Sequence, residues 1–334
     1  MPKTIEKPER TTLPEIDDAT RREFLAGAAA LLVLAPYGCG PAEGNGSSGG
    51  TRKVAHELGT ARVPARPRRV VVMDPYASLQ TALAVGSPVV ASPVFPDEPF
   101  PGFLAETSGI EKLGYDQPSI EKIAALDPDL IVGWVDWIEY SEAYDKLSEI
   151  APTVAARSSF DWKENSRVIA DALNRSGELE SLISDYEGRV EGLKGRLGRS
   201  GGPQVSVVKP REDVLEVYTN RFYAGRILEE VGVRSPENQV VDDPEKTSLE
   251  LSLEPIPEAD ADVIFLMVGG GGEDEGAARE SLRRFESSPL WKRLRAVRNG
   301  RVHEVDPNAW FITSGPQAAN VVLDDLSEYL PRGG

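Results

Sequence analysis

A phrase of fourteen residues occurs twice in this chain, and the repetition constrains the fold more than any other feature. The first copy, SIEKIAALDPDLIV, occupies residues 119–132, and the second, SLEPIPEADADVIF, begins 133 residues later and occupies residues 252–265. Each copy has the pattern of a short helix followed by an apolar strand. We therefore expect two similar lobes that each contain this helix–strand unit. The copies share Ser119/Ser252, Glu121/Glu254, Ile123/Ile256, Asp127/Asp260, Asp129/Asp262 and Ile131/Ile264.

The rest of the chain follows the same rhythm, with one interruption. Short β-branched runs alternate with helical patterns, which indicates parallel α/β sheets. From 165 to 197 no strand pattern occurs and apolar residues recur at helical spacing, with Gly177 as the expected break between two helices. The strand-like runs are RRVVVM (68–73), SPVVAS (87–92), DLIVGW (129–134), APTVAA (151–156), QVSVVK (204–209), VLEVYT (214–219), DVIFLMV (262–268) and RVHEVD (301–306).

These patterns predict an α/β fold of two similar lobes with mainly parallel sheets, bridged by a long interdomain helix, with a ligand cleft between the lobes. We expect an N-terminal lobe over 54–160, a helical segment with the bridging helix over 161–200, and a C-terminal lobe over 201–334. A helix is also expected over 316–330, at the end of the second lobe.

Composition excludes several classes of protein. The chain has 334 residues, 40% of them hydrophobic, which is enough for two cores. A net charge of −17 argues against a nucleic-acid partner, which needs a basic surface. One Cys and two His exclude a disulfide framework, a thiolate cluster and a three-histidine metal site.

The first 38 residues have the pattern of an export signal. Arg21 and Arg22 precede a short apolar run, which resembles a twin-arginine signal; an ordinary signal peptide with unrelated arginines is the alternative. The apolar run is shorter than the roughly 20 residues that span a bilayer. In either case we expect the chain to leave the cytoplasm.

Cys39 follows that run and precedes the Gly/Ser-rich stretch GPAEGNGSSGG. This arrangement resembles a bacterial lipoprotein processing site, although Pro36 stands where such sites usually carry Leu; an unmodified Cys39 is the alternative. We therefore expect a lipid anchor at Cys39 and a flexible tether over 39–53, which would hold the protein at the outer face of the cytoplasmic membrane.

Aromatic and cationic residues follow several of the expected strands. In parallel α/β units ligands bind beyond the carboxyl ends of the strands, so residues placed there are candidates for a pocket wall. Packing in the core is the alternative role for any one of the aromatics. The candidates are Tyr76, Trp134, Trp137, Trp310, Arg211 and Arg221.

No catalytic constellation accompanies them. The chain has no Gly-x-Ser-x-Gly elbow and no Cys–His pair. GGGGEDEG (269–276) lacks the Lys-Ser/Thr of a phosphate loop and is acidic, so we interpret it as a flexible loop.

Taken in order, six segments make the chain resemble the substrate-binding proteins of ABC importers for iron–siderophores and vitamin B12, over about 55 to 331. The resemblance implies two lobes joined by a rigid helix, a metal-chelate ligand in the cleft and a membrane permease as partner. The segments are PRRVVVMDPYASLQTALAVG, KLGYDQPSIEKIAALDPDLIVGW, APTV, GRILEEVG, SPLWKRLRAVRNGRVHEVDPNAWF and LDDLSEYL.

The same resemblance assigns residue roles. It implies that Glu121 and Glu254, one in each lobe, meet arginines of the permease; stabilisation of a helix start is the alternative role. It places Tyr115, Trp137 and Trp310 at the ligand, with Arg211 or Arg221 as cations. Tyr115 stands where hydroxamate binders carry arginine.

These observations predict a monomeric, non-enzymatic binding protein for an Fe(III)–siderophore complex. The chelator would hold the metal, so neither a cofactor nor a protein metal site is expected. A cobalamin or haem binder of the same fold is the near alternative; an exported lipid-anchored hydrolase or a purely structural surface protein is a more distant one.

Overall fold

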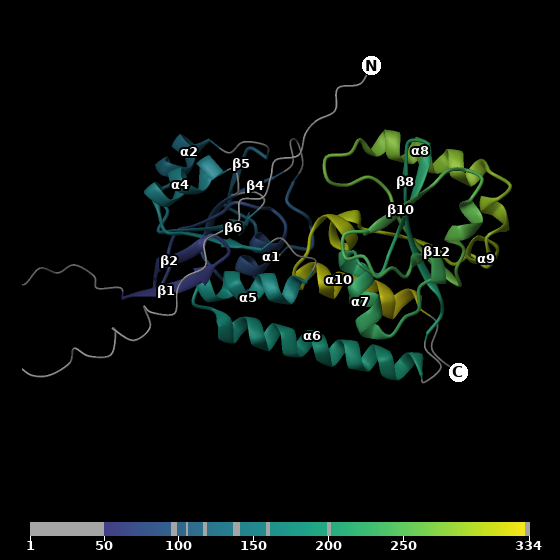
Figure 1. The fold of residues 1–334 in the computed structure, drawn as a ribbon, viewed down its shortest axis with the longest axis horizontal. Helices are drawn as coiled ribbons and strands as arrows, with labels where there is room; N and C mark the ends of the chain where they lie inside the picture. Colours follow the sequence, from purple (N-terminus) through teal and green to yellow (C-terminus); the bar gives the residue numbers. More distant parts are fainter. Residues whose placement is uncertain are drawn as a thin grey trace, which may run out of the picture. The chain divides into compact units, whose positions relative to one another are not determined.

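Two five-stranded sheets, one in each half of the chain, form the framework of the computed structural model (Figure 1). The structure describes residues 50–94, 99–104, 106–115, 119–135, 141–157, 161–198 and 202–330. In the first sheet the order is β5-β4-β3-β6-β7 and every pairing is parallel. Its strands are β3 (Val70–Val72), β4 (Val89–Pro93), β5 (Glu111–Leu113), β6 (Leu130–Trp134) and β7 (Thr153–Ala156).

The second sheet has the order β10-β9-β8-β11-β12, and β9 runs antiparallel to both of its neighbours. Only two residues, Glu212 and Asp213, connect β8 to β9, and so short a connection permits only an antiparallel hairpin. Glu212 takes a positive φ of 40° at this turn. The expected pair of α/β lobes is confirmed; in the second sheet β8, β10, β11 and β12 run in one direction and β9 runs in the other. Its strands are β8 (Val205–Arg211), β9 (Val214–Tyr218), β10 (Ser248–Leu251), β11 (Val263–Met267) and β12 (Val302–Val305).

The repeated phrase occupies equivalent places in the two sheets, because its strands β6 and β11 lie beside β3 and β8 respectively. The repeated aspartates explain part of the similarity between the two copies. The Asp129 carboxylate accepts the backbone N–H groups of Arg68 and Arg69 at 2.7 and 3.0 Å. The Asp262 carboxylate accepts the N–H of Gln204 at 2.9 Å. In each lobe the repeated aspartate thus fixes the start of the neighbouring parallel strand.

The helical parts of the two copies differ. In the first copy Ser119 caps α2 (Ile120–Ala125) by accepting the N–H of Lys122. In the second copy the helix is reduced to a 3₁₀ turn, η3 (Ile256–Ala259). Pro255 and Pro257 lack backbone N–H groups, which prevents a regular α-helix there.

Two helices lie below the sheets in Figure 1: α5 (Trp162–Ala172) lies below the first lobe, and α6 (Ser176–Leu197) extends below both lobes. The 22-residue α6 packs against α5, α7 and α10 and is the expected bridging helix. The break between α5 and α6 lies at Leu173–Arg175, where Asn174 has a φ of 56°. The predicted break at Gly177 is wrong by about one turn, since Gly177 lies inside α6.

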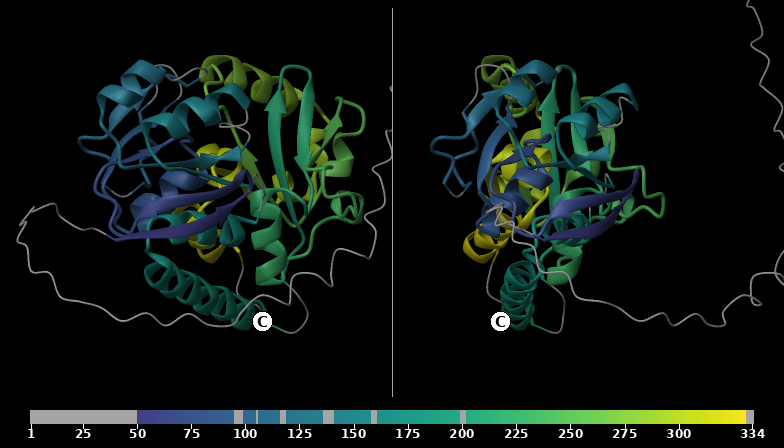
Figure 2. Two further views of the ribbon diagram at one scale, coloured as in Figure 1. Left: turned by 60° about the vertical axis from the view of Figure 1, so that its left-hand side comes forward. Right: turned by 90° about the vertical axis from the view of Figure 1, so that its left-hand side faces the viewer.

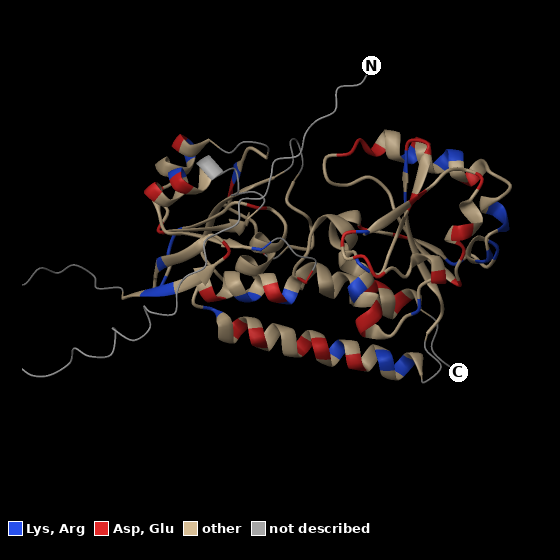
Figure 3. Cartoon of the chain, viewed as in Figure 1, with Lys and Arg blue, Asp and Glu red and all other residues tan. Residues whose placement is uncertain are grey.

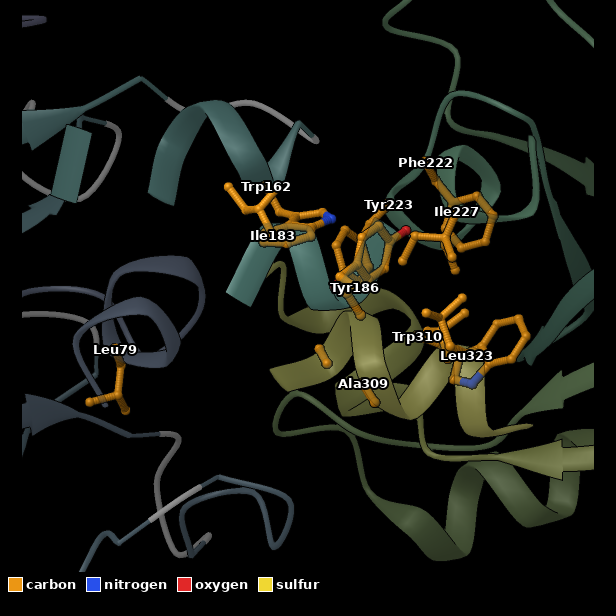
Figure 4. Packing of buried hydrophobic residues seen from close by; sticks show 14 of the residues in the cluster. Leu79, Trp162, Ile183, Tyr186, Phe222, Tyr223, Ile227, Ala309, Trp310 and Leu323 are labelled. Carbon is orange, nitrogen blue, oxygen red and sulfur yellow. The ribbon is translucent and has the colours of Figure 1, made fainter. Parts of the chain in front are cut away.

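One continuous core joins the lobes. It contains side chains from the first sheet, from α5 and α6, and from the second sheet and α10. Figure 4 shows Trp162 of α5, Tyr186 of α6 and Tyr223 of α7 gathered in this core. The Trp162 and Tyr186 rings meet edge to face with centroids 5.1 Å apart. Residues Ser48–Gly334 accordingly form one compact unit.

The outer face of each sheet has a core of its own. In the first lobe α2 and α4 (Ser141–Ile150) cover Val71, Ala91 and Ile131. In the second lobe the cover is provided by a group of helices seen around its sheet in Figure 2. This group consists of α8 (Glu275–Ser287), η4 (Trp291–Arg293) and α9 (Arg295–Arg298).

The lobes also touch directly through α1 (Ala77–Ala84) and α10 (Pro316–Tyr329). The side chain of Gln80 accepts the backbone N–H of Ala318 at 2.9 Å. Gly315, at the start of α10, lies against Gln80, and its carbonyl accepts the hydroxyl of Tyr223 at 2.8 Å. Tyr223 begins α7 (Tyr223–Val231). The remaining short elements are η2 (Glu237–Gln239) and the π-helical turn η5 (Asn308–Ile312).

A hairpin of β1 (Thr51–His56) and β2 (Gly59–Pro64) precedes the first sheet. Thr51, Arg52 and Lys53, predicted as the end of the tether, therefore belong to a strand, and the N–H of Glu57 binds the carbonyl of Ala155 at 3.1 Å. The predicted signal segment 1–38 and Cys39 lie outside the described residues. Within the described ranges no helix is long and apolar enough to cross a membrane.

Candidate functional site

A cavity of about 590 Å³ lies between the lobes. One wall is the segment 99–102 of the first lobe. The other walls are the segments that follow β11 and β12, so the cavity lies beyond the carboxyl ends of these parallel strands, as expected. A smaller pocket shares Pro99, Phe100, Pro101 and Asn308 with this cavity and extends it to Tyr76.

Three of the predicted aromatics lie together at the Tyr76 end. The rings of Tyr76 and Trp134 stack with centroids 5.8 Å apart and an interplanar angle of 27°. Tyr115 meets Tyr76 edge to face at 6.4 Å, and their hydroxyl groups share a hydrogen bond. The indole N–H of Trp134 has no acceptor among the described residues. These half-buried rings form an aromatic wall, which borders the smaller pocket through Tyr76, and the indole nitrogen of Trp134 is buried within it.

A buried carboxylate that the sequence analysis did not single out lies beneath this wall. Asp74 has no exposed surface. Its Oδ1 accepts the backbone N–H groups of Tyr76 and Ser78 at 3.2 and 3.0 Å, and its Oδ2 accepts that of Trp134 at 2.9 Å. Burial raises the pKa of Asp74, although these hydrogen bonds oppose the rise.

The second lobe contributes a buried cation. Lys209, near the end of β8, is only 1% exposed, and its Nζ lies 2.7 Å from the Glu273 carboxylate. Nζ is also 5.8 Å from the centre of the Phe311 ring. Glu273 borders the cavity, so Lys209 lies directly behind the cavity wall. Its signal in the sequence was a lysine within an apolar strand, SVVKP.

Arg211 lies on the same face of β8, two residues further on. Its Nε is 2.8 Å from the Glu216 carboxylate, which also accepts the hydroxyl of Tyr218 at 2.8 Å. Burial and then Glu216 raise the pKa of Tyr218, so that hydroxyl keeps its proton. Tyr218 in turn contacts the ring of Phe311 at 4.9 Å.

The cavity wall contributed by the second lobe is acidic overall. Glu273, Glu275, Glu304 and Asp306 line it together with a single cation, Arg279. Arg279 binds Glu304 at 2.6 Å, and this hydrogen bond raises the pKa of Arg279. Figure 3 shows acidic residues in the loop that leads into α8. That loop, interpreted from the sequence as flexible, is a turn in which Gly269–Gly272 all have positive φ.

Two predicted site residues lie elsewhere. Trp310 is fully buried, packs on Phe265 at 4.6 Å and donates its indole N–H to Asp325 at 2.7 Å. Its neighbour Phe311 is partly buried and packs beside Tyr218 and Lys209. Arg221 follows the carboxyl end of β9, which is the opposite end of the sheet because β9 is antiparallel, and its Nε binds the carbonyl of Val241 at 2.7 Å.

Trp137 lies outside the described residues. Glu121 and Glu254 are both exposed, as docking residues would be. The Glu121 carboxylate accepts the Ser119 hydroxyl at 2.8 Å, and its own backbone N–H and Ser119 lower its pKa. Glu254 lies in the turn before η3 and not at the start of an equivalent α-helix.

Neither histidine borders the cavity: His56 lies beside Tyr144, and His303 stacks on Tyr329 at 4.3 Å. Across the part of the chain that the structure describes, no group of three or more His, Cys, Asp or Glu is placed to hold a metal ion.

Two α/β lobes that enclose a cavity beyond their parallel strands, with a rigid helix below, define a two-lobed binding protein. The chain belongs to the periplasmic binding protein family, whose model matches residues 71–309. This confirms the family expected from the sequence.

Individual relatives support this family assignment. The chain is 35% identical over 314 residues to the probable siderophore-binding lipoprotein YfiY of Bacillus subtilis, covering 90% of this chain and 94% of the relative. It is 31% identical to the achromobactin-binding periplasmic protein of Dickeya dadantii, covering 78% and 86%. Staphylococcus aureus SirA, in its complex with staphyloferrin B, superposes with a TM-score of 0.72 at 27% identity, covering 84% and 99%.

Proposed function

We propose that this protein is the extracytoplasmic substrate-binding lipoprotein of an ABC importer that captures a ferric siderophore. The observation that carries the proposal is the cavity between the lobes, with the aromatic wall of Tyr76, Tyr115 and Trp134 at one end and Lys209 behind its opposite side. The siderophore-binding relatives support the same ligand class.

Different residues would recognise different parts of the chelate. The aromatic wall would cover the apolar parts of the chelate. Lys209 and Arg211 would attract carboxylate or catecholate oxygens. The siderophore itself would hold the iron, so the protein would need no ligand of its own.

The test is a titration of the purified domain with a panel of chelates, followed by quenching of tryptophan fluorescence. The panel holds ferric staphyloferrin B, ferric achromobactin, ferri-bacillibactin, ferric citrate, cobalamin and haem. We expect saturable binding of at least one ferric siderophore, weaker binding of its iron-free form, and no tight binding of cobalamin or haem. Preferential binding of cobalamin or haem would replace the proposed ligand, and binding of none of the panel would reject it.

Delivery would use one exposed acid on each lobe, Glu121 and Glu254. Each pair with a permease arginine would contribute only about 0–1 kcal/mol, which allows release after delivery. We expect the E121R/E254R variant to keep its chelate affinity and to lose uptake in cells. The matched control is E149R/E286R, which changes the charge of another exposed acid on each lobe. Equal uptake by both variants would exclude the docking role.

Export and anchoring would depend on the N-terminal segment. Replacing Arg21 and Arg22 by Lys is expected to retain the precursor in the cytoplasm if the twin-arginine route is used, and unchanged export would indicate the general route. Replacing Cys39 by Ala is expected to release the protein from the membrane fraction. A variant that remained in that fraction would show that Cys39 is not the anchor.

A further inference from the structure

Asp74 ties together the two chain segments that carry the stacked rings. It lies just past the end of β3, between the start of α1 and the end of β6. One carboxylate oxygen receives the N–H groups of Tyr76 and Ser78, and the other receives that of Trp134. The backbones of Tyr76 and Trp134, 58 residues apart in sequence, are therefore held by a single side chain.

We propose that Asp74 is the positioning residue of the ligand site: it does not touch the chelate but sets the stack of Tyr76 on Trp134. Tyr115 would follow, because its ring and hydroxyl both rest on Tyr76. The proposal rests on the proposed function for the identity of the ligand, but the geometry of the stack can be measured without one.

The chemistry of the site requires a carboxylate. Three N–H donors converge on two oxygens, and a carboxylate accepts on both. An asparagine in the same place would offer one oxygen and would turn an N–H₂ group toward one of the donors. Burial raises the pKa of Asp74, so its ionised form costs stability at neutral pH. The cost is consistent with a role in the site and not in overall stability.

The chain supplies a matched control. Asp129 also accepts two backbone N–H groups, those of Arg68 and Arg69, and it joins the same two strands, β3 and β6. It does so at their amino ends, whereas the aromatic wall lies at their carboxyl ends. A purely structural effect of losing such a bond should appear in both variants, and an effect on the aromatic wall only in the Asp74 variant.

The experiment compares Asp74→Asn with Asp129→Asn by near-ultraviolet circular dichroism and by chelate titration. The probe is ferric staphyloferrin B or, if the wild type does not bind it, the member of the panel above that binds most tightly. We expect Asp74→Asn to weaken binding at least about tenfold, equivalent to about 1.4 kcal/mol, and to alter the aromatic spectrum. Asp129→Asn should leave both unchanged. In a Trp134→Phe background the spectral change caused by Asp74→Asn should disappear.

The outcomes separate this proposal from the proposed function. If the protein binds no chelate but Asp74→Asn still causes the Trp134-dependent spectral change, the positioning role of Asp74 stands and the proposed ligand is rejected. Equal spectra and affinities for the two variants would refute the positioning role. If Asp74→Asn does not fold, amide hydrogen exchange in the wild type decides: Ser78 and Trp134 amides that exchange as fast as those of open loops would also refute it.

Discussion

The ion pair between Lys209 and Glu273 predicts an asymmetric response to mutation. The Lys209 side chain is 1% exposed and that of Glu273 is 27% exposed. Removing the Glu273 carboxylate therefore leaves the buried Lys209 ammonium without a charged partner. Removing the Lys209 ammonium leaves a Glu273 carboxylate that water can reach. Breaking a buried pair costs about 3–5 kcal/mol. Because a glutamine oxygen still accepts one hydrogen bond and the cavity is near, we expect Glu273→Gln to cost about 2–3 kcal/mol.

Lys209→Met should cost much less, about 0–1 kcal/mol, since methionine fills a similar volume without charge. The double variant should lie close to Lys209→Met, which gives a coupling energy of about 2 kcal/mol. Urea unfolding followed by far-ultraviolet circular dichroism measures these values. In thermal unfolding Glu273→Gln should lower Tm by about 4–12 °C, taking about 2–4 °C per kcal/mol.

The exposed pair of Arg167 and Glu180, with side chains 51% and 54% exposed, is the control. Glu180→Gln should lower the free energy of unfolding far less than Glu273→Gln does, and high salt should remove the small effect that remains. The reasoning would be refuted if Glu273→Gln and Lys209→Met were equally destabilising, or if the double variant were as unstable as Glu273→Gln.

Three further predictions concern the parts that support the cleft. Trp310→Phe removes the indole donor to Asp325 and should lower the free energy of unfolding by about 1–3 kcal/mol without changing chelate affinity; a loss of affinity at unchanged stability would return Trp310 to the site. Burial raises the pKa of Asp325, so the folded state binds the carboxyl proton more tightly than the unfolded state. The contribution of this group to stability therefore falls as the pH rises from the ordinary pKa of an aspartate to the raised pKa in the folded protein. Asp325→Asn should flatten that part of the Tm–pH profile; an unchanged slope would contradict the assignment. In Gly315→Ala the added Cβ would lie 2.7 Å from the Cβ of Gln80, so we expect a loss of about 1–3 kcal/mol in urea unfolding. Gly188→Ala in α6, which meets nothing within 4 Å, is its control and should be neutral or stabilising; equal effects would exclude an inter-lobe clash.

The fold was largely predictable because its strands are apolar runs separated by helices. The core strands β3, β6 and β11 lie within the predicted runs, and β8 begins within its run and extends two residues beyond it. The hairpin of β1 and β2 was missed because it has one buried hydrophobic residue in each strand, Val54 and Val63, and its remaining positions are polar or partly exposed. A pattern with one buried position per strand carries little periodic signal.

The site was predictable in part. Residues that follow a parallel strand can be assigned to the correct end of the sheet, which brought Tyr76 and Trp134 together. Arg221 was assigned to the wrong end of the sheet, because the direction of β9 depends on a two-residue turn that strand patterns do not reveal. The buried position of Trp310 was not predicted, because the sequence does not show which of two adjacent aromatics, Trp310 or Phe311, turns toward the core. The role of Asp74 depends on three backbone groups that meet only in the folded chain.

The position of α10 determines the order in which the protein can complete its fold. This helix is formed by fourteen residues close to the end of the chain, yet it packs against α1, α5 and α6. While the ribosome is still synthesising those residues, the sides of α1 and α5 that α10 will cover are open, although α1 and α5 themselves already pack on the first sheet. The direct contact between the lobes through α1 and α10 therefore forms only late in synthesis. A ribosome that stalls shortly before Pro316 would release a chain that lacks the packing of α10 against α1, α5 and α6.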